Sequence, residues 1–228
     1  AIAKKKILEW IIKYPQIRIF DVSQNDGGGP CQCDKCQALV QEEGSEAGPI
    51  LRFVNAIARE VAKKYPDKFI STFAYTYSST PPKITKPEGN VIIRLCHNGC
   101  DCHTLEKCEN NASSRNELAQ WGKIAPHLSV WHYTTNFAHY LAPYPNLYAY
   151  GKDIQYYARE TKVDGIFSLG NYNCLGGELS ELRAYLGAQM LWRPELNPDD
   201  VINDFLNGYY GAAAKFIRQY IDLTNQYV

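Results

Sequence analysis

The sequence predicts an α/β protein of the TIM-type (β/α)8-barrel class, of which the 228 residues cover about the last five strands and the C-terminal helices. Five β-rich segments occur along the chain, and segments with apolar residues at helical spacing separate most of them. This alternation is typical of a largely parallel sheet that helices cover on both faces. Each predicted strand ends on polar or aromatic residues, as barrel strands do where they carry a site at their carboxyl ends.

An open, doubly wound sheet is the alternative architecture. It would place a cleft at its switch point, and its dinucleotide-binding members carry a G-x-G-x-x-G loop after a strand. No such loop follows a predicted strand in this sequence, so the barrel is favoured. Because five strands are too few for a closed barrel, we expect three more upstream of Ala1.

The predicted elements follow from local patterns. Ile7, Leu8, Ile11 and Ile12 give the chain an opening helix. β-branched and aromatic residues predict strands at residues 17–22, 69–77, 91–97, 128–134 and 165–169. Apolar spacing predicts helices at residues 50–61, 118–124, 147–161, 182–189, 202–209 and 216–221. Asn197-Pro198 is a favourable helix start, because Asn caps well and Pro is favoured at the first helical position.

Composition excludes several classes of partner. The chain has 24 Lys+Arg and 24 Asp+Glu, so we expect neither nucleic acid nor an anionic membrane surface as its partner. Residues 124–151 lack Asp, Glu, Lys and Arg but contain His, Pro, Asn and Thr, which is unlike a membrane span. The chain begins inside a helical pattern without Met or a signal peptide. We therefore expect one barrel-type domain over residues 1–228, taken from a longer polypeptide with further domains.

Asn25 and Asp26 follow the first predicted strand and precede three glycines. Glycines let a ligand approach the backbone closely, and a carboxyl group there can donate or accept a proton. The alternative role for Asp26 is to cap the turn through its own backbone, as Asp-Gly sequences commonly do. Glu178 closes a second Gly/Asn-rich loop, which also contains Asn171, but it is equally suited to complement the dipole of the next helix.

Aromatic and polar residues mix where later strands end. Trp131, His132, Tyr133 and Asn136 combine ring faces with hydrogen-bonding groups, which suits recognition of a sugar. We expect this set to line a sugar subsite together with Tyr75, His97 and Asn171. Arg94 can pair with a substrate carboxylate or form a salt bridge inside the barrel.

Eight cysteines divide into clusters. Cys31, Cys33 and Cys36 lie within six residues, and three thiolates so close suit a soft metal such as zinc. Disulfides are the alternative, since the number is even and a secreted protein would oxidise them. Cysteines and histidines between 96 and 108 follow the third predicted strand and could meet the first cluster. In either case we expect the cysteines to cross-link the loops rather than to take part in catalysis. We therefore expect no cofactor for catalysis, and a structural zinc ion is one of the two alternatives.

Several separate motifs resemble the family known as domain of unknown function 4838. They are D-V-S-Q-N-D-G-G at 21–28, C-x-C-x-x-C at 31–36, W-x-Y-T-T-N-F at 131–137, L-W-x-P at 191–194 and G-Y-Y-G at 208–211. The resemblance implies a glycoside-hydrolase-like TIM barrel in a larger bacterial protein that is secreted, periplasmic or on the cell surface. The strand-acid-glycine segment is distantly similar to α-glucuronidases, which makes Asp26 the general acid. The family pattern has Asp at position 132 and Glu at position 168, where this chain has His132 and Ser168.

Three functions are compatible with these features. The first is a glycoside hydrolase-like domain acting on a glycan, including glycans that contain uronic acid, with Asp26 as acid and Glu178 or His132 activating water. Asp101 is another possible partner for Asp26. The second is a non-catalytic carbohydrate-binding barrel that has lost its acid pair. The third is a metal-dependent hydrolase or deacetylase, although no three-ligand catalytic zinc pattern is visible.

Overall fold

The computed structural model describes residues 2–227, and its elements follow the predicted order. The strands are β1 (Ile19–Asp21), β2 (Phe69–Ala74), β3 (Val91–Cys96), β4 (His127–Tyr133) and β5 (Val163–Leu169). The helices are α1 (Ile2–Lys13), α2 (Asp34–Glu43), α3 (Ala47–Lys64), α4 (Ala112–Ile124), α5 (Leu147–Glu160), α6 (Ser180–Trp192), α7 (Pro198–Tyr210) and α8 (Ala214–Asn225). Short 3-10 turns are η1 (Thr76–Ser78), η2 (Glu109–Asn111) and η3 (Gly211–Ala213).

Two local predictions were wrong. Helix α2 was not predicted; the residue before it is Cys33, which lacks the usual capping chemistry and makes no side-chain cap. The strand predicted at residues 69–77 ends at Ala74, because Thr76 has a φ of 49° and the chain enters η1. The predicted start of α7 is confirmed, since the Asn197 side chain accepts a hydrogen bond of 2.9 Å from the Asp199 N–H.

The five strands form one sheet in the order β1-β2-β3-β4-β5. β1 pairs in parallel with β2, and β2 pairs in parallel with β3; Ile19 lies opposite Phe69, and Ile70 opposite Val91. A doubly wound sheet reverses its strand order at a switch point, and no reversal occurs among residues 2–227. The α/β class and the parallel sheet are therefore confirmed, and the sequential order is that of neighbouring strands in a barrel.

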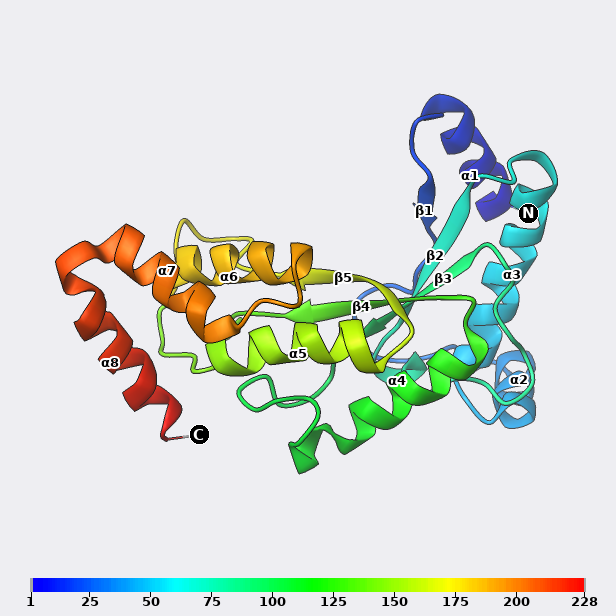
Figure 1. Ribbon diagram of the computed structural model, residues 1–228. Coiled ribbons are helices and arrows are strands. Elements are labelled where there is room, and N and C mark those ends of the chain that lie inside the picture. The colour runs from blue at the N-terminus through cyan, green and yellow to red at the C-terminus, as the bar shows by residue number, and fades with distance from the viewer. Residues whose placement is uncertain (1, 228) are drawn as a thin grey trace. The chain divides into compact units, whose positions relative to one another are not determined.

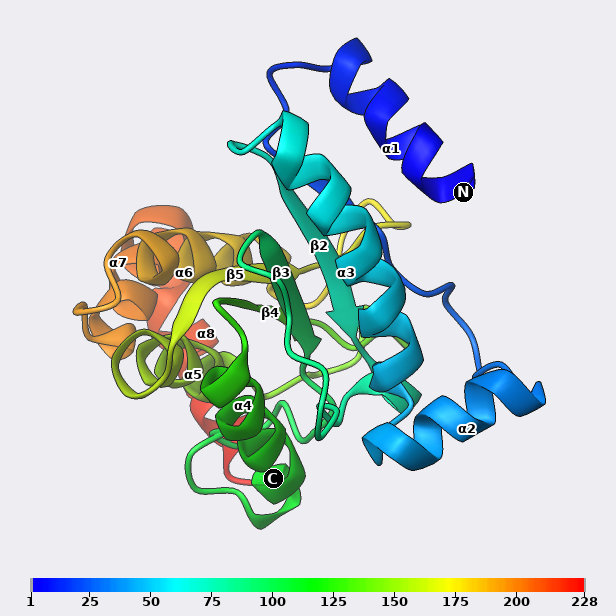
Figure 2. The ribbon, with the colours of Figure 1, turned by 90° about the vertical axis from the view of Figure 1, so that its right-hand side faces the viewer.

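Contacts within the chain define two compact units. Unit 1 comprises residues 2–96, 116–130 and 162–165, and unit 2 comprises residues 97–115, 131–161 and 166–227. In unit 1, α3 packs on β2 and β3, and Figure 2 shows this helix lying along the two strands. Leu51, Val54, Ile57 and Ala58 are buried on α3, while Ile70 is buried on β2. The helical spacing of these apolar residues therefore produces the core of unit 1.

A buried carboxylate braces the end of α2 in unit 1. Glu43 is 0% exposed and accepts hydrogen bonds from the Arg52 Nε (2.7 Å), the Thr85 N–H (2.9 Å) and the Ile84 N–H (3.1 Å). The Thr85 hydroxyl also donates to it. Burial raises the pKa of Glu43, but these bonds outweigh burial and lower the pKa to about 2.

Unit 2 contains the C-terminal helices. Figure 1 shows the chain passing from β5 into α6 and α7 and then turning into α8. α6 packs against α5 and α7, and α7 packs against α8. Their shared core includes Tyr150, Leu186, Met190, Ile202 and Ile221. Among the described residues, no helix has both the length and the apolar character that crossing a membrane requires.

Candidate functional site

The loop after β1 presents Asn25 and Asp26 to solvent at the carboxyl end of the sheet in unit 1. Gly27 and Gly29 have φ values of 122° and 120°, a backbone conformation that other residues adopt only with strain. Space is open around both glycines, because a Cβ atom built on either one would meet no atom within 4 Å. The glycines therefore set the path of the chain and leave the Asp26 carboxyl group accessible.

Hydrogen bonds join the loops that follow β1 and β2. The Gln24 amide donates to the Tyr75 carbonyl oxygen at 3.0 Å and accepts from the Ser78 hydroxyl at 2.5 Å. The Tyr75 N–H in turn donates to the Ser78 hydroxyl at 3.2 Å. Because β1 and β2 are adjacent and parallel, these bonds hold Tyr75 and the Asn25-Asp26 segment at the same end of unit 1.

Arg94 lies in a different part of unit 1. Its guanidinium carbon is 5.6 Å from the centre of the Phe73 ring. The side chain lines a cavity of about 370 Å³ together with Ile19, Phe69 and His127, which come from the amino-terminal ends of their strands. Arg94 therefore reaches toward the end of the strands opposite to the Asp26 loop.

Cys31, Cys33 and Cys36 converge at the start of α2. Their sulfur atoms all lie within 4.8 Å of one another, and the Cys31 and Cys33 sulfurs are 3.5 Å apart. A hydrogen bond from the Cys36 backbone lowers the pKa of Cys33, because Cys33 occupies the cap position of the helix. Hydrogen bonds that the Cys36 thiol donates to the sulfurs of Cys31 and Cys33 raise the pKa of Cys36 to about 11. All eight cysteines fall among residues 2–227 and are free thiols there.

His97 and His132 are buried in unit 2, with side chains 2% and 1% exposed. The His132 ring stacks on Tyr150 at 5.5 Å and lies 5.6 Å from the His97 ring. Burial lowers the pKa of His132 to about 3 and that of His97 to about 4. Both predicted site histidines are therefore neutral core residues of unit 2, and their roles as base and sugar contact would require the rings to become accessible.

Aromatic rings gather at the carboxyl ends of β4 and β5 in unit 2. The centre of the Phe137 ring lies 5.7 Å from that of Tyr133, 5.9 Å from that of Tyr140 and 6.0 Å from that of Tyr172. We call these four residues the aromatic platform. Tyr172 is 70% exposed, so the platform faces solvent. Trp131 is not part of it and packs on Phe167 with the ring centres 4.2 Å apart.

A cavity of about 490 Å³ lies in unit 2, and residues that directly follow β4 and β5 form part of its wall. Ala184, Ala188 and Leu191 also line it, and we call it the polar cavity after its polar side chains. Its lining includes Thr134, Thr135, Ser168, Asn171, Ser180 and Arg183. The Asn171 Nδ2 is buried and donates no hydrogen bond to any described residue. Asn136 has a local role, since its side-chain oxygen accepts from the backbone N–H groups of Ala138 (3.0 Å) and His139 (3.2 Å). None of the described residues lining the cavity is Asp or Glu.

Glu178 is held by an arginine at the start of α6. Its side chain is 12% exposed and forms an ion pair with Arg183. The same guanidinium donates to the Tyr144 carbonyl oxygen at 2.6 Å and to the Asn146 side chain. Arg183 therefore fixes the Glu178 carboxylate and also contributes to the wall of the polar cavity.

Comparison with known proteins identifies the family. The sequence matches the family described as Domain of unknown function (DUF4838) over residues 1–222, which is nearly the whole chain. The chain belongs to this family. No curated protein matches it. The DUF4838 resemblance of the sequence motifs is thus confirmed.

The sequence-predicted site residues of this DUF4838 chain fall into both units. Asn25, Asp26, Tyr75, Arg94 and the first cysteine cluster are in unit 1; His97, Trp131, His132, Tyr133, Asn136, Asn171 and Glu178 are in unit 2. Sequence reasoning missed Phe137, Tyr172 and Arg183. Phe137 closes the W-x-Y-T-T-N-F motif and Tyr172 lies in the Gly/Asn-rich loop, so both were within reach of the sequence. No sequence signal pointed to Arg183, because it acts through tertiary contacts.

Proposed function

We propose that this DUF4838 chain recognises a glycan at the carboxyl ends of β4 and β5 in unit 2. The aromatic platform is the observation that carries this proposal. The rings of Tyr133, Tyr140 and Tyr172 each have their centre about 6 Å from that of Phe137. The four rings provide apolar faces at a solvent-exposed surface. The faces of sugar rings are apolar and their edges carry hydroxyl groups, so such a platform matches one side of a sugar.

The polar cavity supplies the complementary groups. The Asn171 amide nitrogen has a hydrogen to donate and lacks a partner among the described residues, so a ligand hydroxyl oxygen can satisfy it. The Thr135 hydroxyl can donate or accept, and Arg183 brings a positive charge to the same wall. The Thr134 and Ser180 hydroxyls donate to the Leu169 carbonyl oxygen and to the Glu181 carboxylate, so toward a ligand they can accept. A uronic acid would offer a carboxylate to this arginine, but four of its five N–H groups already donate to Glu178, Tyr144 and Asn146.

Glycan hydrolysis is the second candidate, favoured by the accessible Asp26 carboxyl group after β1. We propose Asp26 as the proton donor and the Arg183-bound Glu178 as the group that activates water. Against hydrolysis, Ser168 lines the polar cavity at the position where the family pattern has Glu, and no acid lines that cavity within residues 2–227. The geometry therefore favours binding over hydrolysis.

A structural zinc ion at Cys31, Cys33 and Cys36 is a further part of the proposal. Three sulfur atoms within 4.8 Å can close around one soft cation with a fourth ligand from outside the cluster. Bound there, zinc would brace the segment between the Asp26 loop and α2. The family resemblance adds a secreted or cell-surface location and further domains in the same polypeptide.

Binding and turnover are measured on the same protein. The purified chain is titrated calorimetrically with a panel of neutral and uronic-acid-containing oligosaccharides, and reducing-end release is followed in parallel. Tyr172→Ala should weaken binding about 2- to 10-fold, the effect of losing one aromatic contact. Tyr227→Ala is the matched control, because Tyr227 is 82% exposed and lies beyond α8, outside the platform.

The outcomes separate the two candidates. Binding without turnover supports recognition alone, while turnover that Asp26→Asn abolishes with affinity retained establishes hydrolysis. If the panel contains no ligand, or if Tyr172→Ala and Tyr227→Ala have the same effect, the glycan site on the platform is wrong.

A further inference from the structure

A second group of metal-ligand side chains lies in the loop between β3 and α4, within unit 2. Ligand atoms of Cys100, His103 and Cys108 all lie within 4.8 Å of one another. The Cys100 sulfur is 3.2 Å from the His103 Nδ1. The spacing is C-x2-H-x4-C, so all three ligands come from one short segment.

The backbone that carries these ligands is fixed by buried groups. Asn111 is 0% exposed; its side-chain oxygen accepts from the Cys100 N–H at 2.6 Å, and its nitrogen donates to the Cys100 carbonyl at 3.0 Å. The same nitrogen also donates to the His103 carbonyl oxygen at 3.4 Å. Arg115 donates to the Cys108 carbonyl oxygen at 2.6 Å. Asn111 and Arg115 thus hold the backbone of all three ligand residues.

A glycine is required for this arrangement. A Cβ atom at Gly99 would lie 2.2 Å from the Asn111 side-chain oxygen, so a larger residue would displace the asparagine that holds Cys100. The loop is also tied to α5, because the Leu105 N–H donates to the Asp153 side chain at 2.7 Å. Such support is what keeps ligands at fixed positions before a metal binds.

We propose that Cys100, His103 and Cys108 bind one Zn²⁺ ion. Two thiolates and an imidazole are soft to borderline ligands, which select zinc over Mg²⁺ or Ca²⁺, and no carboxylate belongs to the group. Two thiolates balance the charge of the ion, so the assembled site is neutral. This neutrality makes the site compatible with Lys107 and Lys152, which line the same cavity as His103 and Cys108.

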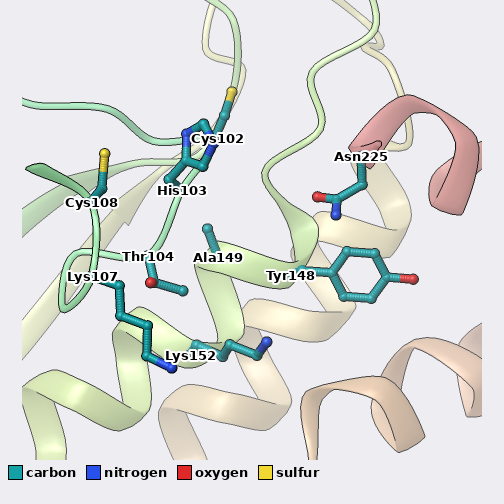
Figure 3. A pocket seen from close by; sticks show the side chains of 9 residues that line it. All are labelled: Cys102, His103, Thr104, Lys107, Cys108, Tyr148, Ala149, Lys152 and Asn225. Carbon is teal, nitrogen blue, oxygen red and sulfur yellow. The ribbon is translucent and has the colours of Figure 1, made fainter. Parts of the chain in front are cut away.

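Two of the three proposed ligand residues border a cavity. His103 and Cys108 line a cavity of about 300 Å³, and Figure 3 shows them on one side of it, with Lys107 and Lys152 also at its wall. Cys102 lines the same cavity, but its sulfur is not within the group of three. A water molecule in this cavity completes the tetrahedral shell, as in zinc sites with three protein ligands.

The test uses a background chain, Cys31→Ser/Cys33→Ser/Cys36→Ser, so that the first cysteine cluster cannot contribute metal. It is purified under reducing conditions and titrated with Zn²⁺ and with Co²⁺, whose absorption spectrum reports sulfur ligation. We expect one ion per chain. Loss of a residue that only supports a metal ligand weakens metal affinity about 10- to 100-fold. Cys100→Ser and Cys108→Ser each remove a ligand itself, so each should weaken Zn²⁺ binding by more than this. His103→Cys should retain Co²⁺ and strengthen the sulfur-to-cobalt charge-transfer absorption.

Two matched controls define the ligand set. Cys102→Ser and His139→Gln should leave the affinity unchanged, since Cys102 is outside the group of three and His139 lies in the exposed loop after β4. Circular dichroism confirms that each variant is folded. The proposal is overturned if the background chain takes up no Zn²⁺, if binding survives Cys100→Ser combined with Cys108→Ser, or if Cys102→Ser abolishes binding. These results are independent of glycan binding and of the first cysteine cluster.

Discussion

The His132 Nε2 lies 3.8 Å from the Asp153 Oδ2, and both side chains are 1% exposed. Burial lowers the pKa of His132 to about 3 and raises that of Asp153 to about 7. Between about pH 4 and 6.5 the unfolded chain carries a charged imidazolium and a charged carboxylate, whereas the folded chain holds both groups neutral. Each state has one proton on the pair, so folding moves a proton from histidine to aspartic acid without net uptake.

Asp153→Asn should make the protein sensitive to acid. The asparagine keeps an oxygen to accept the Leu105 N–H, but it can no longer take up the proton that His132 gives up on folding. The unfolded state then binds one proton more than the folded state below pH 6.5. The free energy of unfolding should fall by up to about 1.4 kcal/mol per pH unit on acidification. Urea unfolding from pH 4 to 8 measures the slope.

His132→Gln is the converse variant. Asp153 keeps its raised pKa, so the folded state binds the extra proton, and stability should decrease as the pH rises from about 4 to 7. Slopes of opposite sign in the two variants would confirm that burial lowers the pKa of His132 and raises that of Asp153. Equal slopes in both variants would contradict at least one of these two pKa shifts.

Glu43→Gln should destabilise unit 1. The buried carboxylate accepts bonds from Arg52, Thr85 and Ile84, and an amide nitrogen in its place would face donors. Arg52 is 34% exposed and keeps Glu42 as a partner, so the cost comes from the buried hydrogen bonds that lose their charged acceptor. We expect a loss of about 1.5–3 kcal/mol in the free energy of unfolding. Thermal and urea unfolding provide the measurement.

Glu42→Gln is the control for this variant. Glu42 also pairs with Arg52, at 2.9 Å, but its side chain is 50% exposed. Its loss should cost less than about 1 kcal/mol, as for surface ion pairs. A similar cost for Glu42→Gln and Glu43→Gln would contradict the role of burial.

Gly187→Ala should destabilise unit 2, although alanine is the better helix former. An added Cβ would lie 2.2 Å from the Tyr150 hydroxyl oxygen and 3.1 Å from a ring carbon, and Tyr150 is buried in the core. We expect a loss of about 1–3 kcal/mol from overpacking, read from the midpoint of thermal unfolding. Gly208→Ala in α7 is the comparison: nothing lies within 4 Å, so it should stabilise by about 0.5–1 kcal/mol. The prediction fails if both variants shift stability in the same direction.

Most elements could be predicted from local patterns. The strands around Phe20, Ile93 and Val130 and the helix that begins after Asn197 were found because side-chain periodicity and capping act over a few residues. Helix α2 was missed because it begins after a cysteine, which is not a usual capping residue. Its one buried residue is Glu43, so it has no buried apolar stripe at helical spacing. The β2 strand was overextended because a positive φ at Thr76 has no marker in the sequence.

The candidate site was predicted in part. Tyr133 and Asn171 lie at the end of β4 and after β5, as the sequence indicated, because parallel strands present their carboxyl ends at one edge. His132 was expected at the same edge, but it alternates with Trp131 and Tyr133 along β4 and so faces the buried side. The sequence alone did not show which face of β4 is covered by helices, and this decides whether His132 or its neighbours are exposed.

The sequence by itself determined the family, the α/β class, the order of the strands and the location of the cysteine clusters, because these depend on motifs and on periodicity along the chain. Only the tertiary structure decided which polar side chains are buried and which partners they meet. His132 with Asp153, Glu178 with Arg183, and Asn111 with Cys100 are pairs of this kind. Burial and hydrogen bonding depend on segments brought together by packing, and no local pattern records the distance between them.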